Sequence, residues 1–244
     1  MAEVMELTQI SLTAEDFDQA FMASLRRYGF AALIHHQLDD DRVQRIYEAW
    51  RAFFGSGAAS AYAMDPEAQD GYFSPEQAES ARGFSQRDYK EYFQYYPWGR
   101  CPDFLQSDLN AHFEAAAALG TRLLRCIAEQ LPAMITAQLT EPLCAMIEQS
   151  GQSMLRVLHY PPFPAGETLL RAAPHEDINL LTLLPFVRMI YNRQSCYLWT
   201  DDDGTTWHIR QGEGGEAAAV IRGRGSCRPQ CVAAGQGRAT WPPS

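Results

Sequence analysis

The sequence predicts a single-domain α+β protein, and three observations support this fold class. Helical spacing of apolar residues dominates residues 1–148, whereas alternating or continuous apolar runs, typical of strands, follow in residues 149–222. With 244 residues, 46% of them hydrophobic, the chain can bury a substantial core. From about Arg210 the composition shifts to Gly, Arg, Ala and Gln, and we expect residues 223–244 to form an irregular tail.

The predicted N-terminal region begins with a helix, a strand and a second helix. Residues 13–16, Thr-Ala-Glu-Asp, resemble a capping box that opens the first helix, and Gly29 ends it. The apolar run Phe30–Ile34 is typical of a buried strand. Acidic residues 39–41 then favour the start of the second helix, which we expect to continue to the aromatic pair before Gly55.

Loops, a long helix and two strands are predicted next. Residues 55–103 are rich in Gly and Pro and are expected to be mostly loops, whereas residues 104–131 carry one apolar stripe typical of a scaffold helix. A shorter helical stretch is expected at 139–147. Residues 153–160 alternate like a strand that stops at a Pro-Pro pair, and residues 175–184 have the apolar character of a buried strand.

Charge and composition narrow the possible partners. The formal net charge is −10, so no basic face is expected to neutralise the phosphates of a nucleic acid or an anionic membrane. The N-terminus has no basic segment followed by an apolar run, and no stretch reaches the ~18 apolar residues of a membrane span. We therefore expect a cytoplasmic protein that acts on a small molecule.

The cysteines predict neither a disulfide framework nor a metal clip. All six are scattered through the chain, which is typical of reduced thiols. Cys227 and Cys231 are close in sequence, but no second ligand pair follows them, so we interpret them as ordinary unpaired cysteines.

The candidate metal-binding motif is His175-x-Asp177. In a strand, residues i and i+2 point to the same face about 6 to 7 Å apart, so the imidazole and the carboxylate can share one metal ion. Two histidines and one carboxylate leave open positions that suit Fe(II), O₂ and a bidentate co-substrate. The motif is short, and both residues also have structural explanations: a hydrogen-bonded polar histidine and an aspartate that accepts turn hydrogen bonds.

The surroundings of this motif resemble the iron-site region of the isopenicillin N synthase-like, 2-oxoglutarate-dependent dioxygenases. In that family a strand ending in Tyr-Pro precedes a segment of the form A-x-H-x-D-x-x-x-x-T-L-L. Tyr160-Pro161, Ala173, His175, Asp177 and the Thr-Leu-Leu of 182–184 fall in those places. Residues 27–30, 71–72 and 88–93 resemble the N-terminal region of the same family, so the likeness covers about residues 5 to 185.

The resemblance implies a fold and a set of residue roles. The implied fold is a distorted double-stranded β-helix, or jelly roll, carrying N-terminal helices. His175 and Asp177 would be iron ligands, and the Tyr160 hydroxyl would help to hold the carboxylate of 2-oxoglutarate. Strand parity places Arg156 on the same face as Tyr160, where its fork could clamp a carboxylate or form a structural ion pair, while His159 points away and is interpreted as structural.

The chain departs from the family pattern near its C-terminal end. In the family a second iron histidine follows the first by about fifty to sixty residues, and an Arg-x-Ser that anchors 2-oxoglutarate comes later. Residues 225–244 contain no histidine, and residues 238–240, Arg-Ala-Thr, are only a faint echo of the second motif. His208 is the one histidine after Asp177 and hence the candidate third ligand. A truncated or frameshifted C-terminus, with the last strands missing or non-native, would explain this departure.

Three functions follow as hypotheses. The first is an oxidoreductase that uses Fe(II), O₂ and 2-oxoglutarate to oxidise a small organic substrate, with activity dependent on whether a third ligand exists. The second is a catalytically inactive remnant or an interaction protein of the same fold. The third is a Zn²⁺-dependent hydrolase, which ranks last because the sequence contains neither H-E-x-x-H nor G-x-S-x-G.

Overall fold

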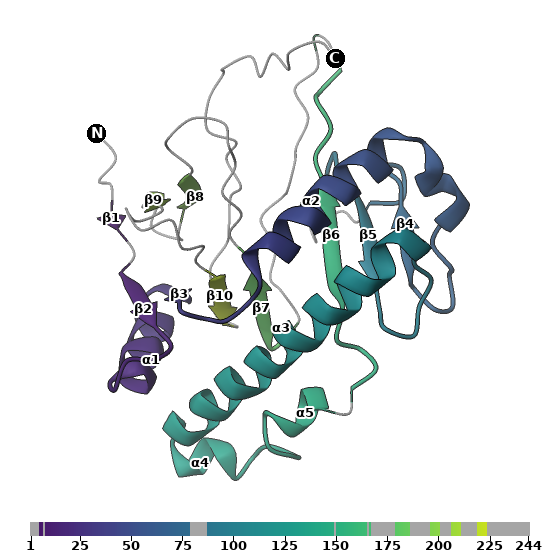
Figure 1. Cartoon of the computed structure of the whole chain (residues 1–244). Helices are drawn as coiled ribbons and strands as arrows, with labels where there is room; N and C mark the ends of the chain where they lie inside the picture. The colour runs from purple at the N-terminus through teal and green to yellow at the C-terminus, as the bar shows by residue number, and fades with distance from the viewer. Residues whose placement is uncertain are drawn as a thin grey trace.

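The computed structural model describes residues 5–6, 8–78, 87–148, 150–164, 166, 179–185, 196–200, 206–210 and 219–223. The helices are α1 (Phe17–Tyr28), α2 (Asp40–Gly55), the 3₁₀ helix η1 (Ala58–Tyr62), α3 (Asp103–Gln130), α4 (Ala133–Thr136) and α5 (Ala145–Glu148). The strands are β1 (Met5–Glu6), β2 (Gln9–Ser11), β3 (Phe30–Ile34), β4 (Gly71–Phe73), β5 (Glu91–Tyr95), β6 (Leu155–His159), β7 (Leu181–Leu184), β8 (Cys196–Thr200), β9 (Thr206–Arg210) and β10 (Ala219–Gly223). Helices and mainly antiparallel sheets confirm the α+β class (Figure 1).

The first helix begins later than predicted. Helix α1 starts at Phe17, and the N-cap Asp16 makes no side-chain capping bond. The predicted capping box at 13–16 is wrong because the Thr13 hydroxyl lies 2.9 Å from Ser11 Oγ, and the Thr13 N–H donates to the same oxygen. The predicted end is confirmed: Gly29 has φ +70°, and its N–H donates to the Leu25 carbonyl at 2.9 Å.

The predicted starts of α2 and α3 are confirmed, but the stretch after α3 is not. At the start of α2 the Arg42 N–H donates to Asp39 Oδ1 at 2.9 Å, which is a standard N-cap. Helix α3 begins one residue earlier and ends one residue earlier than expected. The helix predicted at 139–147 is wrong in extent, because only the single turn α5 forms there, beginning three residues after Pro142.

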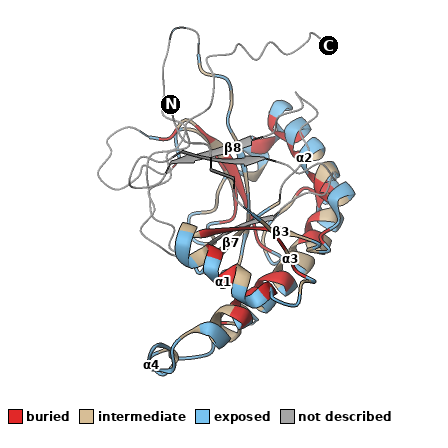
Figure 2. Cartoon of the chain, turned by 90° about the vertical axis from the view of Figure 1, so that its left-hand side faces the viewer, coloured by how far each residue is buried: buried red, intermediate tan, exposed pale blue. Residues whose placement is uncertain are grey.

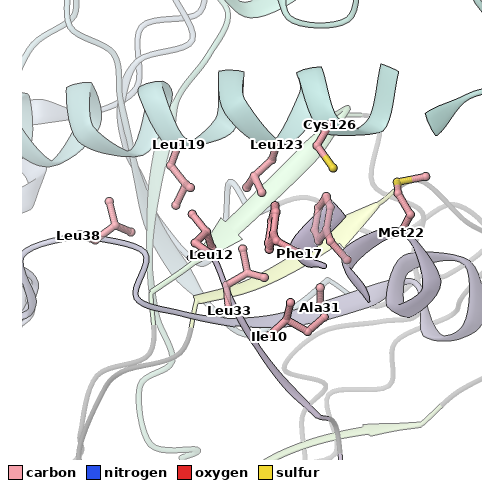
Figure 3. Close-up of a cluster of buried hydrophobic side chains, with 11 residues drawn as sticks. Ile10, Leu12, Phe17, Met22, Ala31, Leu33, Leu38, Leu119, Leu123 and Cys126 are labelled. Atoms are coloured by element: carbon pink, nitrogen blue, oxygen red, sulfur yellow. The ribbon is translucent and has the colours of Figure 1, made fainter. Parts of the chain in front are cut away.

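One core lies between α1, α3 and a four-stranded sheet of order β2-β3-β10-β7. Strand β2 is parallel to β3, whereas β10 pairs antiparallel with both β3 and β7. The side chains between the layers are almost wholly apolar, as Figure 3 shows: Ile10, Leu12, Phe17, Met22, Ala31, Leu33, Leu38, Leu119, Leu123 and Cys126. The strand predicted at Phe30–Ile34 is therefore confirmed as a central, buried strand.

A second core lies between α2, α3 and the antiparallel sheet of order β4-β5-β6. Trp50 at its centre is 1% exposed and packs against Phe53 and Phe93 at centroid distances of 5.1 and 4.8 Å. Figure 1 shows α2 and α3 on one side of these strands, and Figure 2 shows the buried residues of both helices. The prediction of loops over most of residues 55–103 missed β4 and β5.

The remaining strands form a third sheet of order β1-β9-β8. The strand predicted at 175–184 is described from residue 179, and β7 begins only at Leu181. The predicted tail at 223–244 lies almost wholly outside the described residues, so it stays a prediction, as does the complete jelly roll. Among the described helices none is long and apolar enough to cross a membrane.

Candidate active site

Strand β6 separates two environments, because its side chains alternate between partly buried and exposed positions. Leu155, Val157 and His159 are partly buried, whereas Arg156 and Leu158 are exposed. The alternation continues to Tyr160, which is 37% exposed. This confirms the predicted parity, in which Arg156 and Tyr160 share one face and His159 lies on the other.

The packed face of β6 joins the helical layer. Leu155 and Val157 contact the core that contains Trp50 and Phe93. His159 stacks on Phe54, with ring centroids 5.2 Å apart and planes at 13°. Helices α2 and α3 pack on this face, so Arg156, Leu158 and Tyr160 lie on the opposite one.

Glu91 links the three strands on the packed side. The Tyr72 hydroxyl of β4 donates to Glu91 Oε2 at 2.5 Å, and His159 Nδ1 of β6 lies 2.6 Å from Glu91 Oε1. Burial, together with the Glu91 carboxylate, raises the pKa of the Tyr72 phenol. One carboxylate therefore ties β4 to β6 across β5, immediately before Tyr160, and gives His159 a structural role.

We call this opposite face the open face, because Arg156, Leu158 and Tyr160 at β6 are exposed on it, whereas Tyr92 and Gln94 of β5 are buried. Tyr92 pairs with Leu158, and Gln94 pairs with Arg156, so these side chains are direct cross-strand neighbours. An Arg156 guanidinium N–H donates to Gln94 Oε1, and the guanidinium carbon lies 5.0 Å above the Tyr92 ring. Gln94 in turn donates to the Gln69 carbonyl at 2.5 Å.

An aromatic cluster and an ion pair between buried Asp70 and exposed Arg100 lie near the open face. Tyr96 stacks on Trp98 at 4.6 Å, and its hydroxyl lies 3.9 Å from Met154 Sδ. Burial raises the pKa of the Tyr96 phenol, while the charge of Arg156 opposes that rise. Nearby, Asp70 is 3% exposed and accepts both a side-chain bond from Arg100 at 2.8 Å and the Arg100 backbone N–H at 2.6 Å.

The structure places some predicted site residues and leaves others outside its described range. Tyr160 and Arg156 lie on the open face, four residues apart, or about 13 Å along the strand. His175 and Asp177 lie outside the described residues. His208 is in β9, where its backbone is opposite Leu198 and Glu6, and its side chain is not described. The donor types fit the proposed metal, because imidazole nitrogen and carboxylate oxygen are suitable Fe(II) ligands.

Sequence reasoning missed Gln94, Tyr92 and Glu91 as parts of this site. They are 62 to 68 residues from their partners on β6, so no local pattern connects them. The available signal was the resemblance of residues 88–93 to the family's N-terminal region. Only the pairing of β5 with β6 shows which of these side chains face Arg156.

Comparisons with known proteins identify the family of the chain. Residues 4–110 match the family model described as non-haem dioxygenase in morphine synthesis N-terminal. The curated 2-oxoglutarate-dependent dioxygenase htyE of Aspergillus rugulosus is 26% identical over 211 residues, covering 74% of this chain and 62% of the relative. The chain spans only 46% and 62% of the lengths of the first two curated relatives that it matches.

Similar solved structures support the same family. A protein from Shewanella oneidensis assigned as an oxygenase is 37% identical, with a TM-score of 0.74, covering 90% of this chain and 77% of its own. The structure of JOX2 in complex with 2OG, Fe and JA shares the fold at 22% identity, with a TM-score of 0.62, covering 91% of this chain and 66% of its own. Together with the open face of β6, these matches show that the chain belongs to the isopenicillin N synthase-like family of 2-oxoglutarate- and Fe(II)-dependent dioxygenases.

Proposed function

We propose that this protein is an Fe(II)- and 2-oxoglutarate-dependent oxygenase of a small organic substrate. The observation that carries the proposal is the face of β6 opposite the helical layer, which presents Tyr160 just before the segment that contains His175 and Asp177. The curated relative htyE is named as a 2-oxoglutarate-dependent dioxygenase, and JOX2 was solved with 2OG and Fe.

The proposed roles follow from donor chemistry and strand position. His175 and Asp177 would hold Fe(II), which when bound supplies the oxidation chemistry with O₂. The Tyr160 hydroxyl would donate a hydrogen bond to a carboxylate of 2-oxoglutarate. Glu91 and His159 would hold the end of β6 in register, so that Tyr160 keeps its position on the open face.

His208 is the candidate third ligand. It occupies β9, which pairs with β8 and β1. If it completes the site, replacing it with alanine should weaken Fe(II) binding to about the same extent as replacing His175. If replacing His208 leaves Fe(II) binding unchanged, the third ligand must be another group.

The test measures metal binding and turnover separately. An anaerobic Fe(II) titration of the full chain should show one-to-one binding, and Fe(II) with 2-oxoglutarate and O₂ should yield succinate. His175→Ala should abolish both, whereas the matched control His35→Asn should abolish neither, because His35 is exposed and Asn tolerates its φ of +57°. Weak metal binding and no succinate from the wild-type chain would instead favour the inactive remnant.

A further inference from the structure

We propose that the segment around α4 is a self-association surface, through which two copies of this chain form a symmetric dimer. The surface consists of an exposed apolar knob, Met134 and Ile135 of α4, and a hollow beside it. It is built from the end of α3, from α4 and from the chain that follows, and it uses no residue of the candidate active site.

The hollow lies between the last part of α3 and the chain that follows α4. Its volume is about 350 Å³, and its lining is apolar or hydroxyl-bearing except for one carboxylate: Ala128, Thr136, Leu139, Thr140, Glu141, Pro142 and Leu143. Leu143 is buried, whereas Thr140 and Glu141 are exposed. Pockets of this kind at protein interfaces are filled by one or a few apolar anchor side chains of the partner.

The knob stands directly beside the hollow. Met134 is 72% exposed and Ile135 is 42% exposed, although both side chains are apolar. The helical turns continue past α4, since the Leu139 N–H donates to the Thr136 carbonyl, and Ile135 therefore lies one turn before Leu139 on the same side. Figures 1 and 2 show α4 at one end of the molecule, beyond the last turn of α3. An exposed apolar knob next to an open apolar hollow is typical of a protein–protein interaction surface.

A second copy of the chain fits this surface because the knob and the hollow adjoin each other. Under a two-fold rotation the knob of each copy faces the hollow of the other, so both contacts form together. The assembly then closes as a dimer and does not grow further.

The distribution of charge favours the same partner. The chain has a formal net charge of −10, so two copies repel each other in general. Residues 131–140 contain no charged side chain, and two copies can therefore approach here without bringing carboxylates together. Charges of both signs flank this stretch, because Glu141 is exposed and Arg125, one turn before Ala128 on α3, is 58% exposed. An uncharged, Met-containing centre with a charged rim is the usual composition of such an interface.

The test measures the mass of the full chain by sedimentation velocity from about 1 to 300 µM. Because the contact is small, we expect reversible dimerisation with a dissociation constant of about 10 to 100 µM. Met134→Glu and Leu139→Glu should each raise this constant at least about tenfold. Phe104→Glu is the matched control: Phe104 is 68% exposed in the first turn of α3, away from α4, so its replacement should change the constant less than about twofold.

A mixing experiment tests the contact of knob with hollow directly. Met134→Lys and Leu139→Glu chains should each remain monomeric alone, because a charge enters an apolar contact twice. Mixed in equal amounts, they should form a dimer at least about fivefold tighter than either alone. In the mixed dimer the introduced lysine meets the introduced glutamate, and the second contact is that of the wild-type chain.

Three results would overturn the proposal: a wild-type chain that stays monomeric over the whole range, a dimer that Met134→Glu weakens no more than Phe104→Glu does, or a mixture that dimerises no better than its components. Far-UV circular dichroism verifies that each variant is folded. Since the readout is mass, the outcome does not depend on iron, on 2-oxoglutarate or on whether the chain forms succinate.

Discussion

Gly71, the first residue of β4, should tolerate no side chain. Its φ is +94°, a region that L residues rarely adopt, and an added Cβ would lie 2.5 Å from the Tyr62 carbonyl oxygen and 3.1 Å from Arg100 Nη2. Ordinary C···O contacts begin near 3.3 Å, so the overlap with the Tyr62 backbone is about 0.8 Å. Gly71→Ala therefore combines a backbone penalty with a steric clash against an atom that cannot rotate away.

Two other glycines separate these contributions. Gly57 also has a positive φ, +73°, but no atom lies within 4 Å of its added Cβ. Gly57→Ala should therefore lower the free energy of unfolding only through the strained backbone conformation, by about 1 to 2 kcal/mol. Gly71→Ala should cost that amount plus about 1 to 3 kcal/mol for the overlap. Gly55→Ala, which meets neither obstacle, should be neutral or should stabilise α2 by up to about 1 kcal/mol.

The assay is urea denaturation of the full chain and the three variants, with the free energy of unfolding taken at constant slope. Gly71→Ala should be the least stable and Gly55→Ala the most stable. If Gly71→Ala and Gly57→Ala lose the same free energy within about 0.5 kcal/mol, the close approach of Tyr62 contributes nothing and the reasoning is wrong.

Three further predictions concern charged and titrating groups. Glu91→Gln should lower the free energy of unfolding by about 1 to 3 kcal/mol, because it replaces the carboxylate that both Tyr72 and His159 contact. Its control, Glu48→Gln at an exposed position, should lower it by under about 0.5 kcal/mol in the same urea denaturation assay. Burial raises the pKa of Asp70, but its bonds to Arg100 outweigh burial and leave that pKa below its usual value. Asp70 should therefore stabilise the fold above about pH 3.9 and lose this contribution as the pH falls further, and Asp70→Asn should flatten the acid limb of the stability profile. Burial, with the charge of Arg42, lowers the pKa of His112, so the unfolded chain takes up this proton first and stability should fall below about pH 6.5. A His112→Gln variant that keeps the full pH slope in urea denaturation would contradict that assignment.

Local sequence signals were sufficient to predict the helices whose ends are determined by residues within one turn. Gly29 ends α1 in the left-handed conformation, and Asp39 caps α2, because both effects depend on residues within one helical turn. The apolar stripe of α3 predicted a 28-residue helix to within one residue at each end. The parity of β6 was also readable, since a period of two needs no distant partner.

The strands that the sequence did not predict depend on partners far away in the chain. Strands β4 and β5 are short and lie among turn-forming residues. They are stabilised by the pairing of β4 with β5 and of β5 with β6, which their own sequence does not reveal. The contacts of Arg156 were unpredictable for the same reason, because only the register of β5 against β6 brings Gln94 and Tyr92 next to it. In the capping box, the hydrogen bonds of Thr13 to Ser11 were an equally local alternative.

The position of β10 between β3 and β7 bears on how the chain folds during synthesis. β3 ends at Ile34, but the strand that pairs with its second edge begins only at Ala219. At about 5 to 20 residues per second, a ribosome needs roughly 10 to 40 s to make the intervening chain. Throughout that time one edge of the apolar strand β3 can pair with other nascent chains. The yield of folded protein should therefore depend on chaperone supply and translation rate, and not only on the stability of the finished fold.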